Sequence, residues 1–108
     1  MKETISSRDL RPSDVPQADT GWDAIGTFAL TYDGYAAKGF EGCAALANGE
    51  EPMRTLDDYR AALFFERRRW HHFGDEPDSQ AMEGIARLLE KIRELASTDP
   101  RHSDRMGP

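Results

Sequence analysis

The chain has 108 residues, of which 38% are hydrophobic and 9% aromatic, so it is long enough for one compact domain and its composition argues against wholesale disorder. Its 14 basic and 20 acidic residues give a net charge of −6. This balance argues against general nucleic-acid binding, which relies on neutralising phosphates.

Three features indicate a cytoplasmic protein. Cys43 is the single cysteine, so it cannot form an intrachain disulfide, which suits a reducing compartment. No apolar run approaches the ~18 residues that a membrane span requires. The first residues lack the apolar centre of a secretory signal peptide. We therefore expect a cytoplasmic protein without membrane association.

The aromatic residues divide the chain into a folded body and two tails. All of them lie between Trp22 and Phe73, and an aliphatic stripe extends the pattern to Leu95. We expect a helical domain over residues 21–96, a flexible N-terminal arm over 1–20 with little to bury, and a disordered C-terminal tail over 97–108. A body of this size buries limited surface, so self-association or a partner would help to stabilise it.

Two helices are predicted in the first half of this domain. The first begins after Asp19 or Thr20, since either side chain can cap exposed amides, and it ends at Gly34, which tolerates the conformation of a turn. A second, shorter helix is predicted over 40–47, although glycines at 39 and 42 disfavour it. The apolar residues of the first helix follow at helical spacing: Trp22, Ile25, Phe28, Ala29 and Tyr32.

The third predicted helix, from Leu56 to Gly74, has the clearest boundaries. Thr55 caps it, and Asp58 lies three residues on, where its carboxylate can reach back to the cap amide. Its apolar stripe is broad, so we expect this helix to be central and to be contacted on more than one side. The stripe contains Leu56, Tyr59, Leu63, Phe64, Phe65, Trp70 and Phe73.

A last helix starts around Pro77 and Asp78, because proline is tolerated in the first turn and acidic residues suit the helix N-terminus. No segment alternates with the period of a strand. The fold class is therefore predicted to be all-α, a small bundle of about four helices with flexible tails. The apolar face of the last helix contains Met82, Ile85, Leu88, Leu89, Ile92 and Leu95.

A basic and aromatic run near the end of the third helix is the main candidate site. It contains Arg67, Arg68, Trp70, His71 and His72. Arginine beside aromatic side chains is common at protein-binding hot spots, and it can also clamp a phosphate or a carboxylate. Cations at a helix C-terminus also complement its dipole without any further role. A structural role, a protein or anion surface, and a nucleic-acid surface all stay open.

Glu66 is the second candidate, because it interrupts the apolar stripe between Leu63 and Trp70. A buried carboxylate is costly unless it is paired. It is either an acid or base with a shifted pKa, or a structural group held by an arginine such as Arg69 or Arg60. The structural interpretation is the simpler one.

Metal binding and nucleophilic catalysis find little support. His71 and His72 are adjacent, so on a helix their side chains point about 100° apart and do not readily share one metal ion. Cys43 lies in the small-residue stretch GCAALA and is expected to be a buried thiol. The chain has neither a glycine-rich phosphate loop nor a serine elbow. We expect no metal, no cofactor and no catalytic residue.

The strings FALTYDGY, CAALA and LFFERRRWHHFGDEPD, followed by an amphipathic helix, resemble a group of short uncharacterised bacterial proteins. The resemblance covers Trp22 to about Leu95. It implies a bacterial helical domain and assigns no activity, partner or functional residue.

The leading hypothesis is a small non-enzymatic helical protein that binds another protein, as a regulator, adaptor or inhibitor, or that associates with itself. The basic and aromatic run would supply the contacts. Two alternatives stay open: a nucleic-acid-associated regulator that uses residues 67–72 against phosphates, and a small enzyme that uses Glu66 with a nearby histidine.

Overall fold

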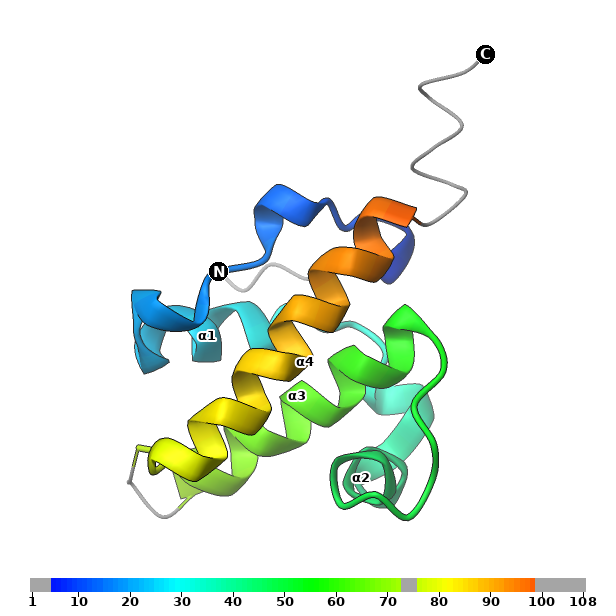
Figure 1. Cartoon of the computed structure of the whole chain (residues 1–108). Helices are drawn as coiled ribbons and strands as arrows, with labels where there is room; N and C mark the ends of the chain where they lie inside the picture. The colour runs from blue at the N-terminus through cyan, green and yellow to red at the C-terminus, as the bar shows by residue number, and fades with distance from the viewer. Residues whose placement is uncertain (1–4, 73–75, 99–108) are drawn as a thin grey trace.

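The computed structural model describes residues 5–72 and 76–98, and within them the chain is helical (Figure 1). The predicted small all-α bundle of about four helices is confirmed. An isolated parallel bridge between Ile5 and Tyr32 is the β-pairing found among these residues. The elements are η1 (Ser7–Asp9), η2 (Pro12–Asp14), η3 (Ala18–Thr20), α1 (Trp22–Ala29), α2 (Tyr35–Ala47), α3 (Leu56–His72) and α4 (Ser79–Thr98), where η marks a short 3-10 turn.

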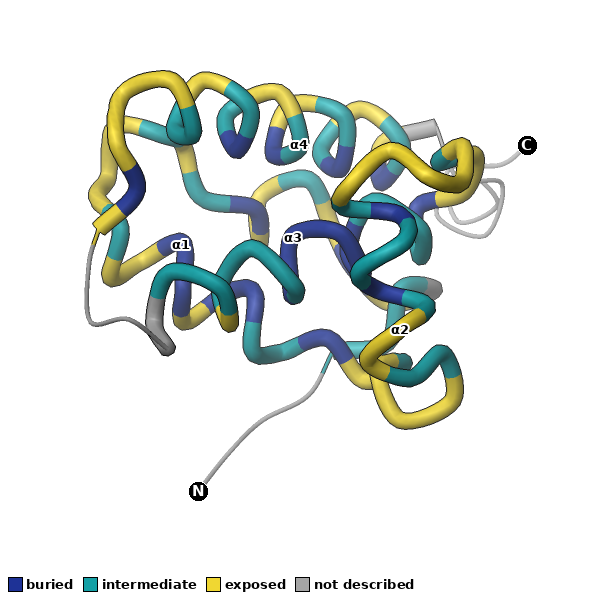
Figure 2. Tube along the Cα trace, turned by 90° about the horizontal axis from the view of Figure 1, so that it is seen from below, coloured by how far each residue is buried: buried dark blue, intermediate teal, exposed yellow. Residues whose placement is uncertain are grey.

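Helix α3 is the centre of the bundle. It packs against α2, α4 and α1, as its broad apolar stripe predicts (Figure 1). Leu56 and Leu63 belong to one core cluster with residues of α1 and α4, whereas Ala61, Ala62 and Phe64 belong to a second cluster with residues of α2. Buried positions therefore occur on more than one side of α3, while those of α4 follow a single inner stripe (Figure 2).

Side chains fix the starts of α3 and α4 as predicted. The Asp58 backbone N–H donates to Thr55 Oγ1 at 3.1 Å, and Asp58 Oδ2 accepts from the Thr55 backbone N–H at 3.2 Å. Asp78 Oδ1 accepts from the Ala81 backbone N–H at 2.8 Å at the start of α4. Burial opposes the charge on Asp58, but hydrogen bonds from the Arg54 and Thr55 amides lower the pKa of this carboxyl below its usual range.

The boundaries of α1 and α2 differ from the prediction. Neither Asp19 nor Thr20 caps α1, which Gly21 precedes with a φ of 111°. Helix α1 ends at Ala29, before the predicted turn, and just beyond its end the Thr31 carbonyl accepts a hydrogen bond from the Ile5 amide at 2.7 Å instead of from a following helical amide.

Helix α2 begins at Tyr35, five residues before the predicted start at residue 40, and is kinked at Gly39. Gly39 has a φ of 83°, a conformation that a residue without Cβ adopts at little cost. A separate turn of helix therefore fits in front of the predicted segment.

Residues 5–20, called the N-terminal segment below, contribute to the core. Leu10 has an exposed fraction of 0%, and Val15 is buried with it in the cluster shared by α1, α3 and α4. Arg93 of α4 donates to the carbonyls of Val15 and Pro16 at 3.2 and 2.9 Å. The expectation that residues 1–20 have little to bury is wrong for this segment, because Leu10 and Val15 fill space between the helices. Helical periodicity does not reveal such a role for isolated apolar residues outside a helix.

Arg60 holds the N-terminal segment on the bundle. Its side chain is 2% exposed, and its Nη1 donates to the Ile5 carbonyl at 2.6 Å and to Ser7 Oγ at 3.2 Å. Its Nη2 donates to Thr31 Oγ1 at 3.1 Å. The guanidinium carbon lies 5.7 Å from the ring centroid of Phe28 and 5.4 Å from that of Tyr32. The cation is thus solvated by a carbonyl, two hydroxyls and two aromatic faces.

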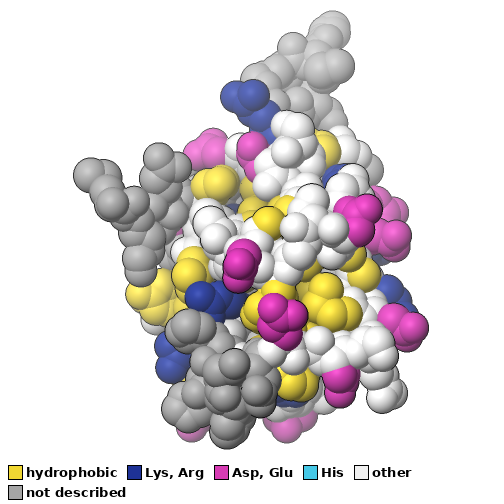
Figure 3. Space-filling view, turned by 90° about the vertical axis from the view of Figure 1, so that its left-hand side faces the viewer, with side chains coloured by type: hydrophobic (Ala, Val, Ile, Leu, Met, Phe, Trp, Pro, Cys, Tyr) yellow, Lys and Arg dark blue, Asp and Glu magenta, His cyan; other side chains and the backbone are white. Residues whose placement is uncertain are grey.

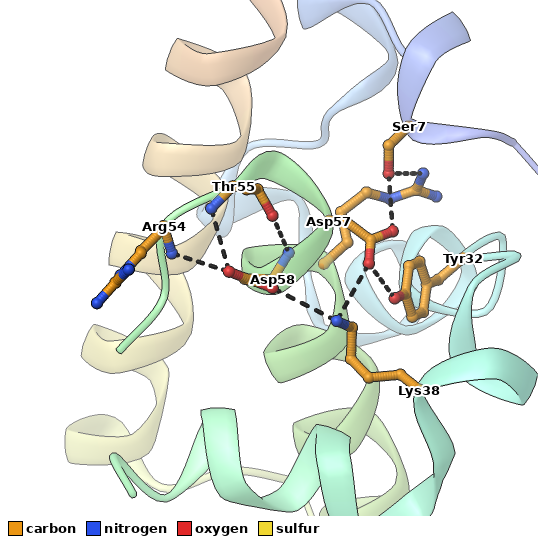
Figure 4. A network of polar contacts seen from close by, with 8 residues as sticks. Ser7, Tyr32, Lys38, Arg54, Thr55, Asp57 and Asp58 are labelled. Carbon is orange, nitrogen blue, oxygen red and sulfur yellow. Dashed lines mark hydrogen bonds and ion pairs between the residues drawn. The ribbon is translucent and has the colours of Figure 1, made fainter. Parts of the chain in front are cut away.

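A polar network next to Arg60 joins the same elements (Figure 4). Asp57 accepts hydrogen bonds from the Tyr32 hydroxyl at 2.8 Å and from Ser7 Oγ at 3.4 Å. Lys38 Nζ lies 3.4 Å from carboxylate oxygens of both Asp57 and Asp58. Burial and the hydrogen bond to Asp57 raise the pKa of Tyr32 far above its ordinary range, so its hydroxyl stays a donor.

Replacing Arg60 with methionine should destabilise the fold by about 2–4 kcal/mol, because the Ile5 carbonyl and the Thr31 hydroxyl lose their buried donor. Urea unfolding followed by circular dichroism measures this loss, and hydrogen exchange of the N-terminal segment should accelerate with it. Arg87→Met, at an exposed position of α4, is the matched control and should change stability by less than about 0.5 kcal/mol. Equal stability of the two variants would contradict this role.

Candidate functional site

The predicted basic run does not form a single surface. Consecutive helix positions point about 100° apart, so each arginine contacts a different neighbour. Arg67 covers Gly26 of α1 so closely that a Cβ atom added at Gly26 would lie 2.6 Å from Arg67 Nε. Arg68 points instead toward α2, where its guanidinium carbon lies 5.7 Å from the centroid of the Phe40 ring.

Arg69 occupies a third direction. Its Nη2 donates to Asn48 Oδ1 at 2.5 Å, and its guanidinium carbon lies 5.0 Å from the centroid of the Phe65 ring. Trp70 lies with Glu66 in a separate cavity described below. The side chains of His71 and His72 lie outside the described residues.

Arg68 instead joins a groove between α2 and α3, which we call the aromatic groove. Its volume is about 400 Å³. Two of its aromatic side chains are well exposed, Tyr35 at 48% and Phe40 at 61%. The groove is lined by Tyr35, Ala36, Gly39, Phe40, Cys43, Phe64, Phe65 and Arg68.

The kink at Gly39 creates this groove. In a continuous helix, Tyr35 and Phe40 would be five positions apart and would point about 140° away from each other. The break at Gly39, which lies between them, allows both rings to reach α3. Tyr35 stacks on Phe64 with centroids 4.8 Å apart, and Phe40 meets Phe65 at 5.2 Å in a tilted arrangement.

Sequence reasoning missed Tyr35 and Phe40 as site residues. The first helix was expected to end at Gly34 and the second to start at residue 40, so Tyr35 fell between them and neither ring was placed beside α3. The available signal was a glycine between two aromatic residues in a segment otherwise rich in alanine. A helix break at that glycine lets both rings reach α3.

Arg68 provides an unpaired cation at the rim of the groove. It is exposed and makes no ion pair with any residue that the structure describes. Lys38, the other basic residue near this end of α2, is already paired with Asp57 and Asp58. A carboxylate that approached the groove would therefore meet Arg68 without displacing a partner.

Cys43 forms part of the groove floor. Its side chain is buried, as predicted, and burial raises the pKa of the thiol. It therefore acts as a small apolar group rather than as a nucleophile.

Glu66 lines a second cavity, between α2, α3, α4 and the α2–α3 loop, which we call the Glu66 cavity. Its volume is about 300 Å³. The Glu66 side chain is 15% exposed, and its nearest basic atom is Arg69 Nη1, 3.9 Å from Oε2, so the predicted tie to Arg69 is confirmed as a long ion pair. The lining residues are Ala47, Met53, Ala62, Glu66, Arg69, Trp70, Ala81, Gly84, Ile85 and Leu88.

Burial raises the pKa of Glu66, and Arg69 and Trp70 only partly oppose this shift. The indole of Trp70 is close enough to favour the ionised carboxylate, but its Nε1 is buried and meets no described acceptor in hydrogen-bond geometry. The cavity therefore contains a buried indole N–H without an acceptor in good geometry, beside a carboxylate whose cation lies only at ion-pair distance.

One further face of the protein is mixed in charge (Figure 3). On the face that carries α1, hydrophobic side chains reach the surface between separate acidic and basic groups (Figure 3). Among the described residues, no group of histidine, cysteine, aspartate or glutamate side chains is arranged to hold a metal ion.

Replacing Glu66 with glutamine should stabilise the protein at pH 7. The pKa of Glu66 is raised in the folded state, so the ionised form weakens the fold above that pKa, and the penalty disappears as the pH falls toward the unfolded value near ~4.3. Urea unfolding between pH 4 and pH 8 should show a gain for Glu66→Gln that shrinks with acidity. Glu90→Gln on α4 is the matched charge control. A gain that does not depend on pH would contradict the assignment.

Comparison with known protein families, with characterised proteins and with solved structures finds no match for this chain. The resemblance to short bacterial proteins therefore stays a prediction. Within the described residues, no helix is both long and apolar enough to cross a membrane.

Proposed function

We propose that this protein acts by binding another protein, and that the aromatic groove receives the partner. The observation that supports this most is the exposure of Tyr35 and Phe40, at 48% and 61%, beside a groove of about 400 Å³. Exposed apolar surface that converges on one hollow is typical of an interaction site, whereas single exposed apolar residues are ordinary.

The groove fits an apolar anchor from the partner. Its walls are aromatic rings, and one large side chain inserted between them would contribute roughly 1.5–3 kcal/mol through burial. Aromatic pockets with an arginine at the rim are common at the energetic centres of protein interfaces. The partner segment is therefore an amphipathic one with a large apolar residue.

Arg68 adds a preference for an acidic group beside that anchor. The protein carries a net charge of −6, so an acidic partner gains no long-range attraction and must be recognised locally. Arg68 meets this requirement because it is exposed and faces Phe40 rather than a carboxylate. We infer a partner segment with a carboxylate within one helical turn of its apolar anchor.

The divergence of the three arginines supports protein binding over the nucleic-acid alternative. Arg67 lies against α1, Arg68 against Phe40, and Arg69 against Asn48 and Phe65. Binding to a phosphate backbone depends on several cations along one track. The enzyme alternative requires Glu66 and a histidine in one cavity, and it receives support only from the position of Glu66.

Replacing Phe40 with alanine should weaken partner binding at least tenfold. Peptides selected from a random phage library against the full chain provide the ligand, and fluorescence anisotropy measures their affinity. Phe40 is exposed, so the free energy of unfolding of the variant should lie within about 0.5 kcal/mol of the wild-type value. Selected peptides that bind Phe40→Ala as tightly as wild type would show that the groove is not the site.

Replacing Arg68 with alanine should lower the affinity of the same peptides about threefold to tenfold. It should also reduce the salt dependence of their binding, because one exposed charge pair is lost. Arg87→Ala on α4 is the matched control and should leave both quantities unchanged. An identical salt dependence in wild type and Arg68→Ala would contradict the preference for an acidic group.

A further inference from the structure

The Glu66 cavity has no part in the proposed docking groove. We propose that it is a binding site for a small molecule, or a terminal group of a chain, that carries a carboxamide on a short hydrocarbon arm. The inference rests on the polar atoms, the wall and the empty space of this cavity, and it is independent of the proposed protein partner.

Two polar groups in the cavity lack full partners. Trp70 Nε1 is buried and meets no described acceptor in full hydrogen-bond geometry, although the indole lies close enough to the Glu66 carboxylate to lower its pKa. The Glu66 carboxylate is 15% exposed and reaches Arg69 only at 3.9 Å, which is beyond hydrogen-bond distance. Glu66 and Trp70 are four residues apart on α3, so they occupy the same side of the helix. A buried donor without an acceptor destabilises the fold, and a ligand that accepts from Trp70 Nε1 would recover this loss.

An amide is the group that satisfies both. Its carbonyl oxygen accepts from Trp70 Nε1, and its N–H donates to the Glu66 carboxylate. An ammonium group would donate to Glu66, but it has no acceptor for Trp70 Nε1 and would be repelled by the Arg69 guanidinium, which also lines the cavity. A carboxylate would accept from Trp70, but it has no N–H for Glu66 and would be repelled by that residue. The neutral donor–acceptor pair of an amide avoids both repulsions.

The rest of the wall is apolar and sparsely filled. Met53, Ile85 and Leu88 supply hydrocarbon, and the small residues between them leave room. A Cβ atom built at Gly84 meets nothing within 4 Å, although Gly84 lies in the middle of α4. Glycine in a helix interior stabilises the helix less than alanine does. This position therefore keeps space open at the expense of helix stability.

Binding of hexanamide to the full chain tests the proposal, with the indole N–H resonance of Trp70 in nitrogen-15 NMR as the readout. Trp22 is the second tryptophan, so a Trp22→Phe variant assigns the two indole signals. We expect a saturable shift of the Trp70 signal, with a dissociation constant on the order of 1 mM for a probe of this size. Methyl hexanoate can only accept hydrogen bonds, and hexylammonium can only donate them. Both should bind at least tenfold more weakly than hexanamide.

A cavity-filling variant separates binding from general association. Gly84→Leu should keep the helical circular dichroism signal, since leucine favours helix, and should abolish the hexanamide shift. Phe40→Ala should bind hexanamide like wild type, which separates failure of this proposal from failure of the protein-binding proposal. The absence of a shift in wild type, equal binding of the three probes, or a shift that persists in Gly84→Leu would each overturn the inference.

Discussion

The buried guanidinium of Arg60 is the constraint on which the rest of the structure depends. Burial lowers the pKa of Arg60, with the charges of Asp33 and Asp57 opposing the shift, but a guanidinium stays protonated in proteins. A buried cation must therefore be solvated by the protein itself. The Ile5 carbonyl and the Ser7 and Thr31 hydroxyls do this only when the N-terminal segment lies against α1 and α3. One side chain of the central helix thus specifies where a segment more than fifty positions away must lie.

The same residue is connected to the aromatic groove through stacked rings. The Arg60 guanidinium faces Tyr32, the Tyr32 ring contacts Phe64 at 6.1 Å, and Phe64 stacks on Tyr35. The Tyr32 hydroxyl is fixed by Asp57, which also holds Lys38 on α2 just before the kink at Gly39 (Figure 4). The exposed rings of the groove are therefore supported from below by buried, hydrogen-bonded groups. Because these rings are already held in place, they lose less conformational entropy when a partner binds.

The sequence predicted the parts of the fold that local chemistry determines. Thr55 and Asp58 form the cap that marks the start of α3, and the apolar stripe of α4 can be recognised without knowledge of the tertiary contacts. The early end of α1 was not predicted, and the hydrogen bond just beyond it, from the Ile5 amide to the Thr31 carbonyl, joins residues far apart in sequence. The arginine run was named as a candidate site, but periodicity gives only the direction of each side chain, so the neighbours that Arg67, Arg68 and Arg69 contact could not be predicted. Glu66 was recognised because a carboxylate in an apolar stripe conflicts with local rules, and such conflicts often mark functional positions.

Helix α3 lines both the aromatic groove and the Glu66 cavity, and Arg69 contacts a residue of each. Phe65 and Arg68 line the aromatic groove, whereas Glu66 and Trp70 line the Glu66 cavity. The Arg69 guanidinium lies over the Phe65 ring, donates to Asn48 and forms the long ion pair with Glu66. Arg69 therefore divides its contacts between the Phe65 ring, which lies against Phe40 in the aromatic groove, and the carboxylate of the Glu66 cavity. The two sites are linked through this one side chain.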